Sequence, residues 1–457
     1  MMSVINYILG LGAAVFLPIV MIILGLCMKM KIKKAIIAGL TLGIAFTGMN
    51  VVLSFMFNSI SPAASAFVQN TGIQLTSIDV GWSPMSAIAW AWPYAVLLFP
   101  LQIGINIVML GLKLTDCLNV DLWNVWGKIF TATMVAAVTG NVFWGFVAAG
   151  IQVILELKSA DISQKQLYRI TKIPGVACSH YMCIQAALLA PINRLLDFVP
   201  GINKININAE QLKKKIGIFG ENSVMGFIVG TLIAAFAGYD LKGILTTAVE
   251  VSTALVLFPM VAKLFMQALA PIADATSTIM KKKFKGRQIY IGLDWPFLAG
   301  QSELWVASII LVPIELLLAI VMSKSGLNNV IPLAGIVNTV VIVPALIVTG
   351  GNLIRMIILG IIATPIYLAV ATSFSPIITD LAKSVGTITI PSGQYITYFG
   401  IEMPELRWLL AHGFNIVNGE ILAPILLIGY FALFLWYKKY MKNKDFIAES
   451  ESNAASF

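Results

Sequence analysis

Charged residues are scarce in this chain of 457 residues: 11% are Asp, Glu, Lys or Arg, and 59% are hydrophobic. Soluble domains carry about 25% charged residues. The mean hydropathy is +0.90. A surface this apolar is excluded from water, because only hydrocarbon solvates it without a large free-energy cost. The composition therefore indicates a polytopic membrane protein.

Motifs of catalysis and cofactor binding are also missing. The sequence has no G-x-x-x-x-G-K-[ST] loop to hold phosphate, no H-E-x-x-H zinc spacing and only two histidines. Its four cysteines have no C-x-x-C spacing, so we expect them to be small apolar side chains. We therefore expect no cofactor, no metal site and no catalytic or phosphorylated residue.

The net charge of +9 lies in short loops between apolar segments. This pattern sets the topology of a membrane protein and does not indicate a nucleic-acid partner. Lysines follow the first apolar segment at 29–34 and the last one at 438–444. We therefore expect the N-terminus outside and the C-terminus in the cytoplasm.

Apolar segments recur along almost the whole chain. A transmembrane helix needs about 20 apolar residues. We expect an all-α protein of about eleven spans, near residues 7–28, 35–57, 82–113, 122–139, 140–157, 216–238, 243–262, 303–322, 328–349, 353–372 and 408–437. The turn between the fourth and fifth spans falls at Gly140-Asn141.

Two stretches of the sequence resemble each other. One begins Asp79-Val80-Gly81-Trp82 and the other Tyr290-Ile291-Gly292-Leu293-Asp294, each followed by an apolar run that contains a proline. The loop charges predict opposite orientations for them, which is typical of two inverted five-span repeats with a substrate site between them. Two short, proline-broken pieces, 173–200 and 384–405, are predicted to be re-entrant elements entering from opposite faces.

Ionisable side chains within such segments are costly in lipid and are therefore functional candidates. We single out His180, Glu221 with its neighbour Asn222, and Asp294 as substrate-binding residues. The alternatives are a structural histidine, an interfacial carboxylate for Glu221 and a helix N-cap for Asp294. Carboxylates, amides and one imidazole suit a neutral ligand rich in hydroxyl groups.

A second group of side chains is a candidate wall for the substrate. It comprises Trp82, Trp90, Gln301 and Gln394. The alternative for the two tryptophans is an interfacial aromatic belt. Asn141, Asn338 and Asn352 lie within apolar runs, and we expect these amides to bond helices to one another.

Residues 7–440 resemble the galactitol-type membrane subunit (enzyme IIC) of the bacterial phosphotransferase system (PTS), in the ascorbate–galactitol superfamily. The stretches that carry the resemblance are 17–20, 79–82, 119–124, 219–221, 237–243, 291–294 and 351–355.

The resemblance implies a homodimer in a bacterial inner membrane that works by elevator-type alternating access. It implies a dimerisation domain (1–60 and 216–265), a mobile core domain (80–215 and 285–437) and a cytoplasmic tail (438–457). The substrate is expected to be a sugar alcohol, galactitol first, phosphorylated by a separate cytoplasmic IIB protein with a phosphocysteine, which a IIA protein charges. The resemblance places substrate contacts at His180, Glu221 and Asp294.

Other interpretations stay open at this point. Departures from the galactitol pattern after Glu221 and after Asp294 leave another hexitol, a pentitol or a related sugar as the substrate. An ion-coupled secondary transporter of a polyol or sugar is the first rival to group translocation. A membrane receptor or scaffold is the second.

Overall fold

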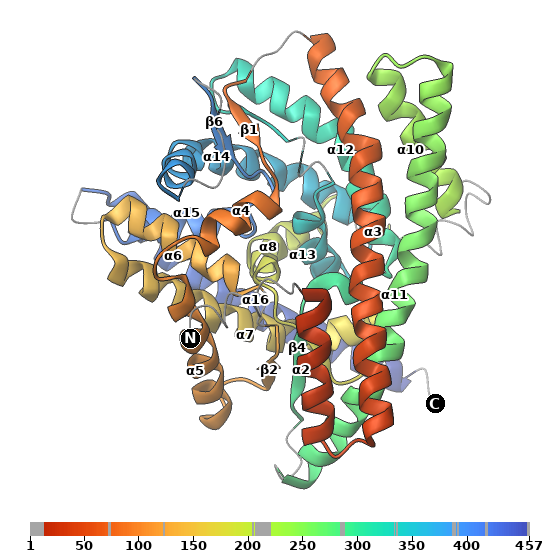
Figure 1. The fold of residues 1–457 in the computed structure, drawn as a ribbon, viewed down its shortest axis with the longest axis vertical. Helices are drawn as coiled ribbons and strands as arrows, with labels where there is room; N and C mark the ends of the chain where they lie inside the picture. Colours follow the sequence, from red (N-terminus) through yellow and green to blue (C-terminus); the bar gives the residue numbers. More distant parts are fainter. Residues whose placement is uncertain are drawn as a thin grey trace.

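The computed structural model is mostly helical, with six short strands among the residues it describes (Figure 1). It describes residues 13–71, 75–121, 124–202, 205, 221–283, 288–332, 334, 337–385, 390, 393–415 and 419–454.

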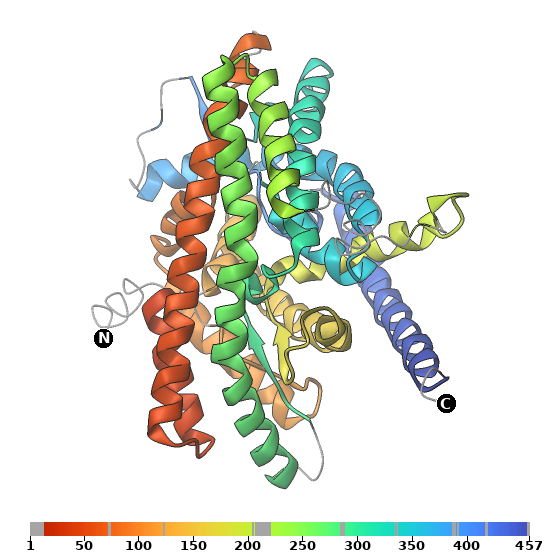
Figure 2. The ribbon, with the colours of Figure 1, turned by 90° about the vertical axis from the view of Figure 1, so that its right-hand side faces the viewer.

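Four helices form a long frame along one side of the molecule (Figures 1 and 2). They are α2 (Ala13–Cys27), α3 (Ile32–Thr71), α10 (Asn222–Phe236) and α11 (Leu241–Lys283). The turn between α2 and α3 lies at the lower end in Figure 1, whereas the turn between α10 and α11 lies at the upper end. The long helices α3 and α11 pack side by side and run antiparallel.

The long frame helices extend beyond the predicted spans. Helix α3 continues to Thr71, although the sequence indicated a loop after residue 57. Helix α11 continues to Lys283, well beyond the span expected to end at residue 262. The predicted ends marked the length of apolar segment that crosses a bilayer. A helix can continue past the hydrocarbon region because its backbone hydrogen bonds are internal.

The remaining helices form a core beside the frame. They are α4 (Trp82–Trp90), α5 (Leu98–Gly111), α6 (Val125–Thr139), α7 (Val142–Thr171), α8 (Ala186–Leu196), α12 (Ser302–Lys324), α13 (Thr339–Thr349), α14 (Leu353–Val385), α15 (Pro404–Gly413) and α16 (Leu422–Ala454). Three short 3₁₀ segments join them: η1 (Ala95–Leu97), η2 (Tyr181–Gln185) and η5 (Trp295–Leu298). Phe258 of α11 stacks on Trp305 of α12 at a ring-centroid distance of 3.4 Å and so packs the frame against the core.

Two local predictions have clear outcomes. The turn at Gly140-Asn141 is confirmed: Gly140 has φ 67°, and the Asn141 side chain accepts a hydrogen bond from the Phe143 backbone N–H at 2.9 Å. The segment predicted as one span over 82–113 is not a straight helix, because it bends by 89° between α4 and α5. Pro93 lies in this break and cannot donate a helical hydrogen bond.

Two three-stranded parallel sheets were not predicted by the all-α interpretation. The upper sheet has the order β5-β1-β6, from Val330–Ile331, Ser77–Asp79 and Tyr395–Thr397. The lower sheet has the order β2-β4-β3, from Cys117–Asn119, Tyr290–Leu293 and Val176–Cys178. Strands of two to four residues carry too little periodicity to be recognised in an apolar sequence.

Both predicted broken pieces are short and irregular in the structure. The first contains β3, η2 and α8. In the second, β6 is followed by α15, while residues 386–389 and 391–392 lie outside the described part. The C-terminal helix α16 continues past residue 437 to Ala454, so the segment predicted as a tail is helical up to that residue.

Within the described residues, five helices are long and apolar enough to cross a membrane, or six if the bent pair α4–α5 is one span. Five further apolar helices are shorter. Every one of the eleven predicted spans contains a helix. The polytopic class is therefore confirmed, and the number of crossings stays a prediction.

Close packing of α10 on α11 gives a first test. A Cβ added at Gly230 would lie 2.7 Å from Ala248 Cα, whereas one at Gly104 of α5 would meet nothing within 4 Å. We expect Gly230→Ala to lower the thermal midpoint of the purified protein in detergent, with a cost of about 1–3 kcal/mol. The matched control Gly104→Ala should leave the midpoint unchanged or higher, since alanine favours helix. Equal midpoints for the two variants would contradict this packing.

Candidate functional site

The lower sheet brings polar residues to one level near the centre of the molecule. Strands β2 and β3 both pair in parallel with β4, with Asn119 opposite Gly292 and Cys178 opposite Leu293. Continuing this register past the strand ends places Asp121 and Ser179 beside Asp294. The ends of parallel strands meet at one edge of a sheet, so this edge collects acidic and polar side chains from three distant parts of the sequence.

A glycine is required at the centre of this sheet. A Cβ on Gly292 would lie 2.6 Å from Cys117 Sγ and 2.7 Å from Ser179 Oγ. Both distances are shorter than side chains tolerate. The glycine in the Ile291-Gly292-Leu293-Asp294 stretch therefore allows the three strands to approach, and it does so immediately before the acidic residue of the site.

His180 and Asp294 form the centre of the candidate site. His180 Nε2 lies 3.7 Å from Asp294 Oδ1, and both side chains are largely buried. His180 Nδ1 accepts a hydrogen bond from the Met182 backbone N–H at 3.2 Å. A neutral imidazole that accepts at Nδ1 carries its proton on Nε2, so it presents a donor toward the carboxylate. The distance is long for a direct hydrogen bond.

Asp294 has a structural role as well. Its carboxylate accepts from the Trp295 backbone N–H at 2.7 Å and caps the 3₁₀ segment η5. The N-cap alternative is therefore realised, together with the contact to His180. A short side chain held by the backbone is fixed in orientation, which suits a ligand-binding carboxylate.

Asp121 and Asn124 complete the acidic edge, and the sequence analysis missed both. Asn124 Nδ2 donates to Asp121 Oδ2 at 2.7 Å, and the Asn124 side chain also hydrogen bonds to Asp294. One amide thus links two carboxylates that come from separate strands. Both residues lie in the 119–124 stretch that carries the family resemblance, so the signal was present without an assigned role.

A buried ion pair lies next to this edge. Lys128 Nζ is 2.7 Å from Glu156 Oε2, and the two side chains are 1% and 0% exposed. Gln152 donates to Glu156 Oε1 at 2.9 Å and accepts from Thr131. The Lys128 ammonium also lies 5.2 Å from the centre of the Tyr181 ring. Charges this deeply buried are stable only when paired and hydrogen bonded.

A second charged group reaches the site from the other broken piece. Tyr181 stacks on His180 at 4.2 Å, and its hydroxyl lies 3.5 Å from Glu402 Oε1. Tyr398 donates to the same carboxylate at 3.3 Å. The buried guanidinium of Arg407, on α15, donates to the Gly127 carbonyl at 3.2 Å and lies 4.6 Å from the Phe130 ring centre.

The other predicted residues lie in several places. Glu221 is half-buried at the start of α10, and Asn222 is the first residue of that helix. Gln301 precedes α12 and is half-buried, and Gln394 is exposed before β6. Trp82 is 47% exposed, whereas Trp90 stacks on Phe99 at 5.5 Å. Among the contacts of the described residues, the structure brings His180 and Asp294 together; the role of the others stays a prediction.

The three amides in apolar runs cap helices. Asn141 Oδ1 caps α7 and Asn338 Oδ1 caps α13 through the Val341 backbone N–H at 3.3 Å. Asn352 Oδ1 accepts from the Arg355 backbone N–H at the start of α14. Asn338 also interacts with Glu315 of α12, which agrees with the expectation that these amides bond helices to one another, and Asn352 also donates to the Ile205 carbonyl. The bond described for the Asn141 side chain is the local cap.

Comparison with known proteins agrees with this architecture. The family model described as "PTS system sugar-specific permease component" matches residues 7–393. The chain is 33% identical to the "PTS system galactitol-specific EIIC component" of Escherichia coli (strain K12), over 97% of this chain and 99% of that protein. It is 31% identical to the "Putative permease IIC component" of the same strain, over 93% and 98% of the two chains.

An apolar, mostly helical chain with several helices long enough to cross a bilayer is a polytopic membrane protein. The chain belongs to the family of sugar-specific permease components of the PTS. The resemblance stated from the sequence is confirmed. Membership implies a sugar substrate, a location in the inner membrane and partner IIA and IIB components.

The buried ion pair gives a second prediction. Lys128→Met leaves Glu156 without its counter-ion, and we expect a loss of about 3–5 kcal/mol in the free energy of unfolding. The double variant K128M/E156Q removes both charges and keeps an acceptor for Gln152, so it should recover most of that loss. Thermal unfolding in detergent measures both changes. A double variant as unstable as Lys128→Met would show that the loss does not come from the unpaired Glu156 carboxylate.

Proposed function

We propose that the chain binds and translocates a sugar alcohol as the IIC subunit of a PTS, with galactitol as the leading candidate. The observation that carries the proposal is the 33% identity over 97% of the chain to a galactitol-specific relative. A separate IIB protein phosphorylates the bound polyol in this proposal, and the product leaves as its phosphate. An ion-coupled transporter is the rival hypothesis.

The chemistry of the acidic edge supports a polyol. Asp121 and Asp294 accept hydrogen bonds, His180 donates from Nε2, and Asn124 is able to do both. A hexitol must replace many hydrogen bonds to water when it enters a buried site. A set of donors and acceptors with little net positive charge meets this need better than it meets the need of an anionic sugar.

The strand pairing supports two inverted repeats. The central strand β1 pairs with β5 and β6, and the central strand β4 pairs with β2 and β3. The register pairs Ser77 with Val330 in one sheet and Tyr290 with Cys117 in the other. The same offset along the sequence leads from Ser77 to Tyr290 and from Cys117 to Val330. The two sheets are therefore related by a repeat of the sequence, and each sheet pairs strands from both halves of the chain.

The antiparallel frame supports an elevator mechanism. We infer that the frame is the dimerisation domain (1–60 and 216–265), and that the core (80–215 and 285–437) moves against it, followed by the tail (438–457). On α3, Ile36, Leu40 and Ile44 are 40%, 58% and 61% exposed and lie four residues apart. This apolar stripe would face lipid or the second protomer of a homodimer.

The positions of the lysines support the predicted membrane orientation and a docking surface for a partner protein. Lys29, Lys31 and Lys33 lie at the same end of the frame as the end of α11. We infer that this end is cytoplasmic, as is the end of α16, with the N-terminus outside. A basic surface at this end would attract a partner protein by long-range electrostatics.

Transport in vesicles separates the two hypotheses. In vesicles that contain this chain and are supplied with the phosphorelay proteins, we expect polyol phosphate to accumulate after proton and sodium gradients are dissipated. Group translocation derives its driving force from phosphoryl transfer, so it needs no ion gradient. Uptake that stops when the gradients are lost, and never yields a phosphate ester, would favour the ion-coupled carrier.

The acidic edge gives a prediction for binding. We expect Asp294→Asn to weaken polyol binding at least tenfold, because the amide accepts at only one oxygen and carries no charge. The fold should persist, since asparagine caps a helix as well as aspartate does. Asp380→Asn, an exposed position on α14, is the matched control. Equilibrium binding of radiolabelled galactitol to the purified protein measures the change.

Glu221→Gln tests whether the start of α10 belongs to the substrate site, a question that the contacts of the described residues do not answer. We expect a similar loss of binding if the start of α10 faces the substrate across the boundary between frame and core. Unchanged affinity in both Asp294→Asn and Glu221→Gln, with intact folding, would reject this assignment of the site.

A further inference from the structure

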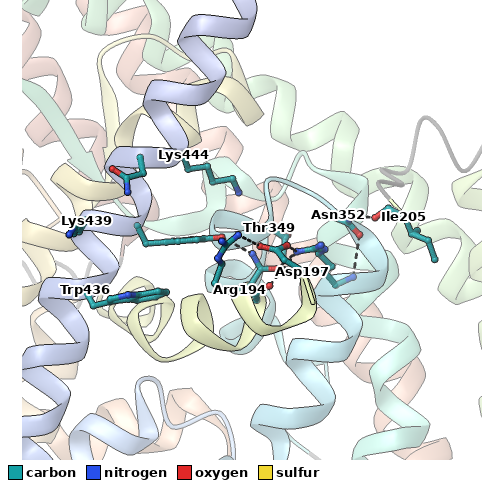
Figure 3. Close-up of a pocket in the computed structure, with 12 residues that line it drawn as sticks. Arg194, Asp197, Ile205, Thr349, Asn352, Trp436, Lys439 and Lys444 are labelled. Atoms are coloured by element: carbon teal, nitrogen blue, oxygen red, sulfur yellow. Dashed lines mark hydrogen bonds and ion pairs between the residues drawn. The ribbon is translucent and has the colours of Figure 1, made fainter. Parts of the chain in front are cut away.

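A cavity lies apart from the acidic edge, between α8, α14 and α16. It has a volume of about 670 Å³, which falls in the range of small-molecule sites. Figure 3 shows its lining, in which Arg194, Asp197, Thr349, Asn352 and Lys444 converge on one space, with Trp436 and Lys439 at the side.

The lining is strongly cationic. Four basic side chains border the cavity, namely Arg194, Arg355, Lys439 and Lys444. Among the lining residues described, Asp197 supplies a carboxylate. Asp197 bridges the two arginines, with Oδ1 2.7 Å from Arg355 Nη1 and Oδ2 2.8 Å from Arg194 Nη1. One carboxylate cannot neutralise four cations, so the cavity keeps an excess of positive charge.

The arginines are positioned and still have donors to offer. The hydrogen bonds described for the Arg355 side chain all use Nη1, to Asp197 and to both oxygens of Asn193. The one described for Arg194 also uses Nη1. A guanidinium has five N–H groups, and the fork that remains matches two oxygens of a phosphate. Asp197 thus orients the arginines without using up their capacity.

Neighbouring groups add to the positive potential. Lys444 Nζ donates to the Val348 carbonyl at 2.7 Å, which holds the ammonium beside the cavity. Helix α14 begins next to it at Leu353, and the positive end of a helix dipole favours an anion. Trp436 and Tyr440 stack at 5.2 Å and give the cavity one aromatic wall.

The geometry points to this cavity as a binding site for a phosphate group. Each part of a phosphate ester matches one part of the lining. Its oxygens accept hydrogen bonds from the two arginines, its negative charge attracts the two lysines, and its organic part packs on the aromatic wall. The site differs from the acidic edge, whose carboxylates repel such a group.

One element of the fold connects the two sites. His180 precedes η2, which continues into α8, and α8 carries Asn193 and Arg194 to the cavity. Eleven helical residues span about 16 Å, so the cavity and the acidic edge are separate sites on one rigid piece. Two sources of phosphate fit this position: a soluble sugar phosphate and the headgroup of an anionic lipid.

Charge-neutralising variants test the inference. We expect inorganic phosphate, titrated at constant ionic strength, to raise the thermal midpoint of the full-length protein in detergent, because binding to the folded state stabilises it. The double variant R194Q/K439Q should bind phosphate about tenfold more weakly. K438Q/K442Q removes two positive charges from α16, the helix of Lys439, but at residues that line a different cavity. It is the matched control and should respond like the unmodified protein.

The source of the phosphate follows from two further probes. Stabilisation by a hexitol phosphate but not by the free hexitol, lost in R194Q/K439Q, would assign the site to a soluble ester. Stabilisation in nanodiscs of phosphatidylglycerol over phosphatidylcholine, lost in the same variant, would assign it to a lipid headgroup. Equal responses of R194Q/K439Q and K438Q/K442Q to all these probes would overturn the inference.

Discussion

The hydrogen bonding of a broken backbone inside an apolar protein is the constraint on which the rest of this structure depends. Extended segments that interrupt helices leave N–H and C=O groups that lipid cannot satisfy. The structure meets this need with two small parallel sheets. In the lower one, the Tyr290 N–H donates to Asp116 O at 2.8 Å, and the Ser179 N–H donates to Leu293 O at 3.0 Å. Each central strand is thereby covered on both edges.

The same solution creates the chemistry of the site. Side chains just past the end of a strand are no longer part of the sheet. Three strand ends at one level place several such side chains close together. The two sheets differ in what they do with this opportunity. In the upper sheet Asp79 accepts from the Phe399 and Gly81 backbone N–H groups and so ties strands together. In the lower sheet Asp294 uses one short backbone bond and turns toward His180 and Asn124.

The sequence predicted the class and much of the helical framework, because hydrophobic length and loop charge report on the membrane directly. It also singled out His180 and Asp294, which the structure brings together, since an ionisable residue in a broken apolar segment is costly and therefore conspicuous. It failed for Asp121, Lys128 and Arg407. Lys128 pairs with Glu156 of the next helix, Arg407 reaches Gly127 from the other half of the chain, and Asp121 comes beside Asp294 through the strand register. Pairings of this kind depend on strand register and helix packing, which local patterns do not contain.

Compensation of buried charge explains why the missed residues belong with the site. Lys128, paired with Glu156, and Arg407, paired with Glu402, both lie near the ring of Tyr181, which stacks on His180. Both cations lie over aromatic rings, at 5.2 Å from Tyr181 and 4.6 Å from Phe130. Such contacts stabilise a desolvated cation and fix the ring beneath it. His180 therefore sits on a ring that α6 and α15 hold in place, and these helices come from the two halves of the chain. A rearrangement that separates the halves must break the hydrogen bond from Arg407 to the Gly127 carbonyl and the contact between Tyr181 and Glu402. The cost of exposing a buried charge favours carrying the cluster as one body.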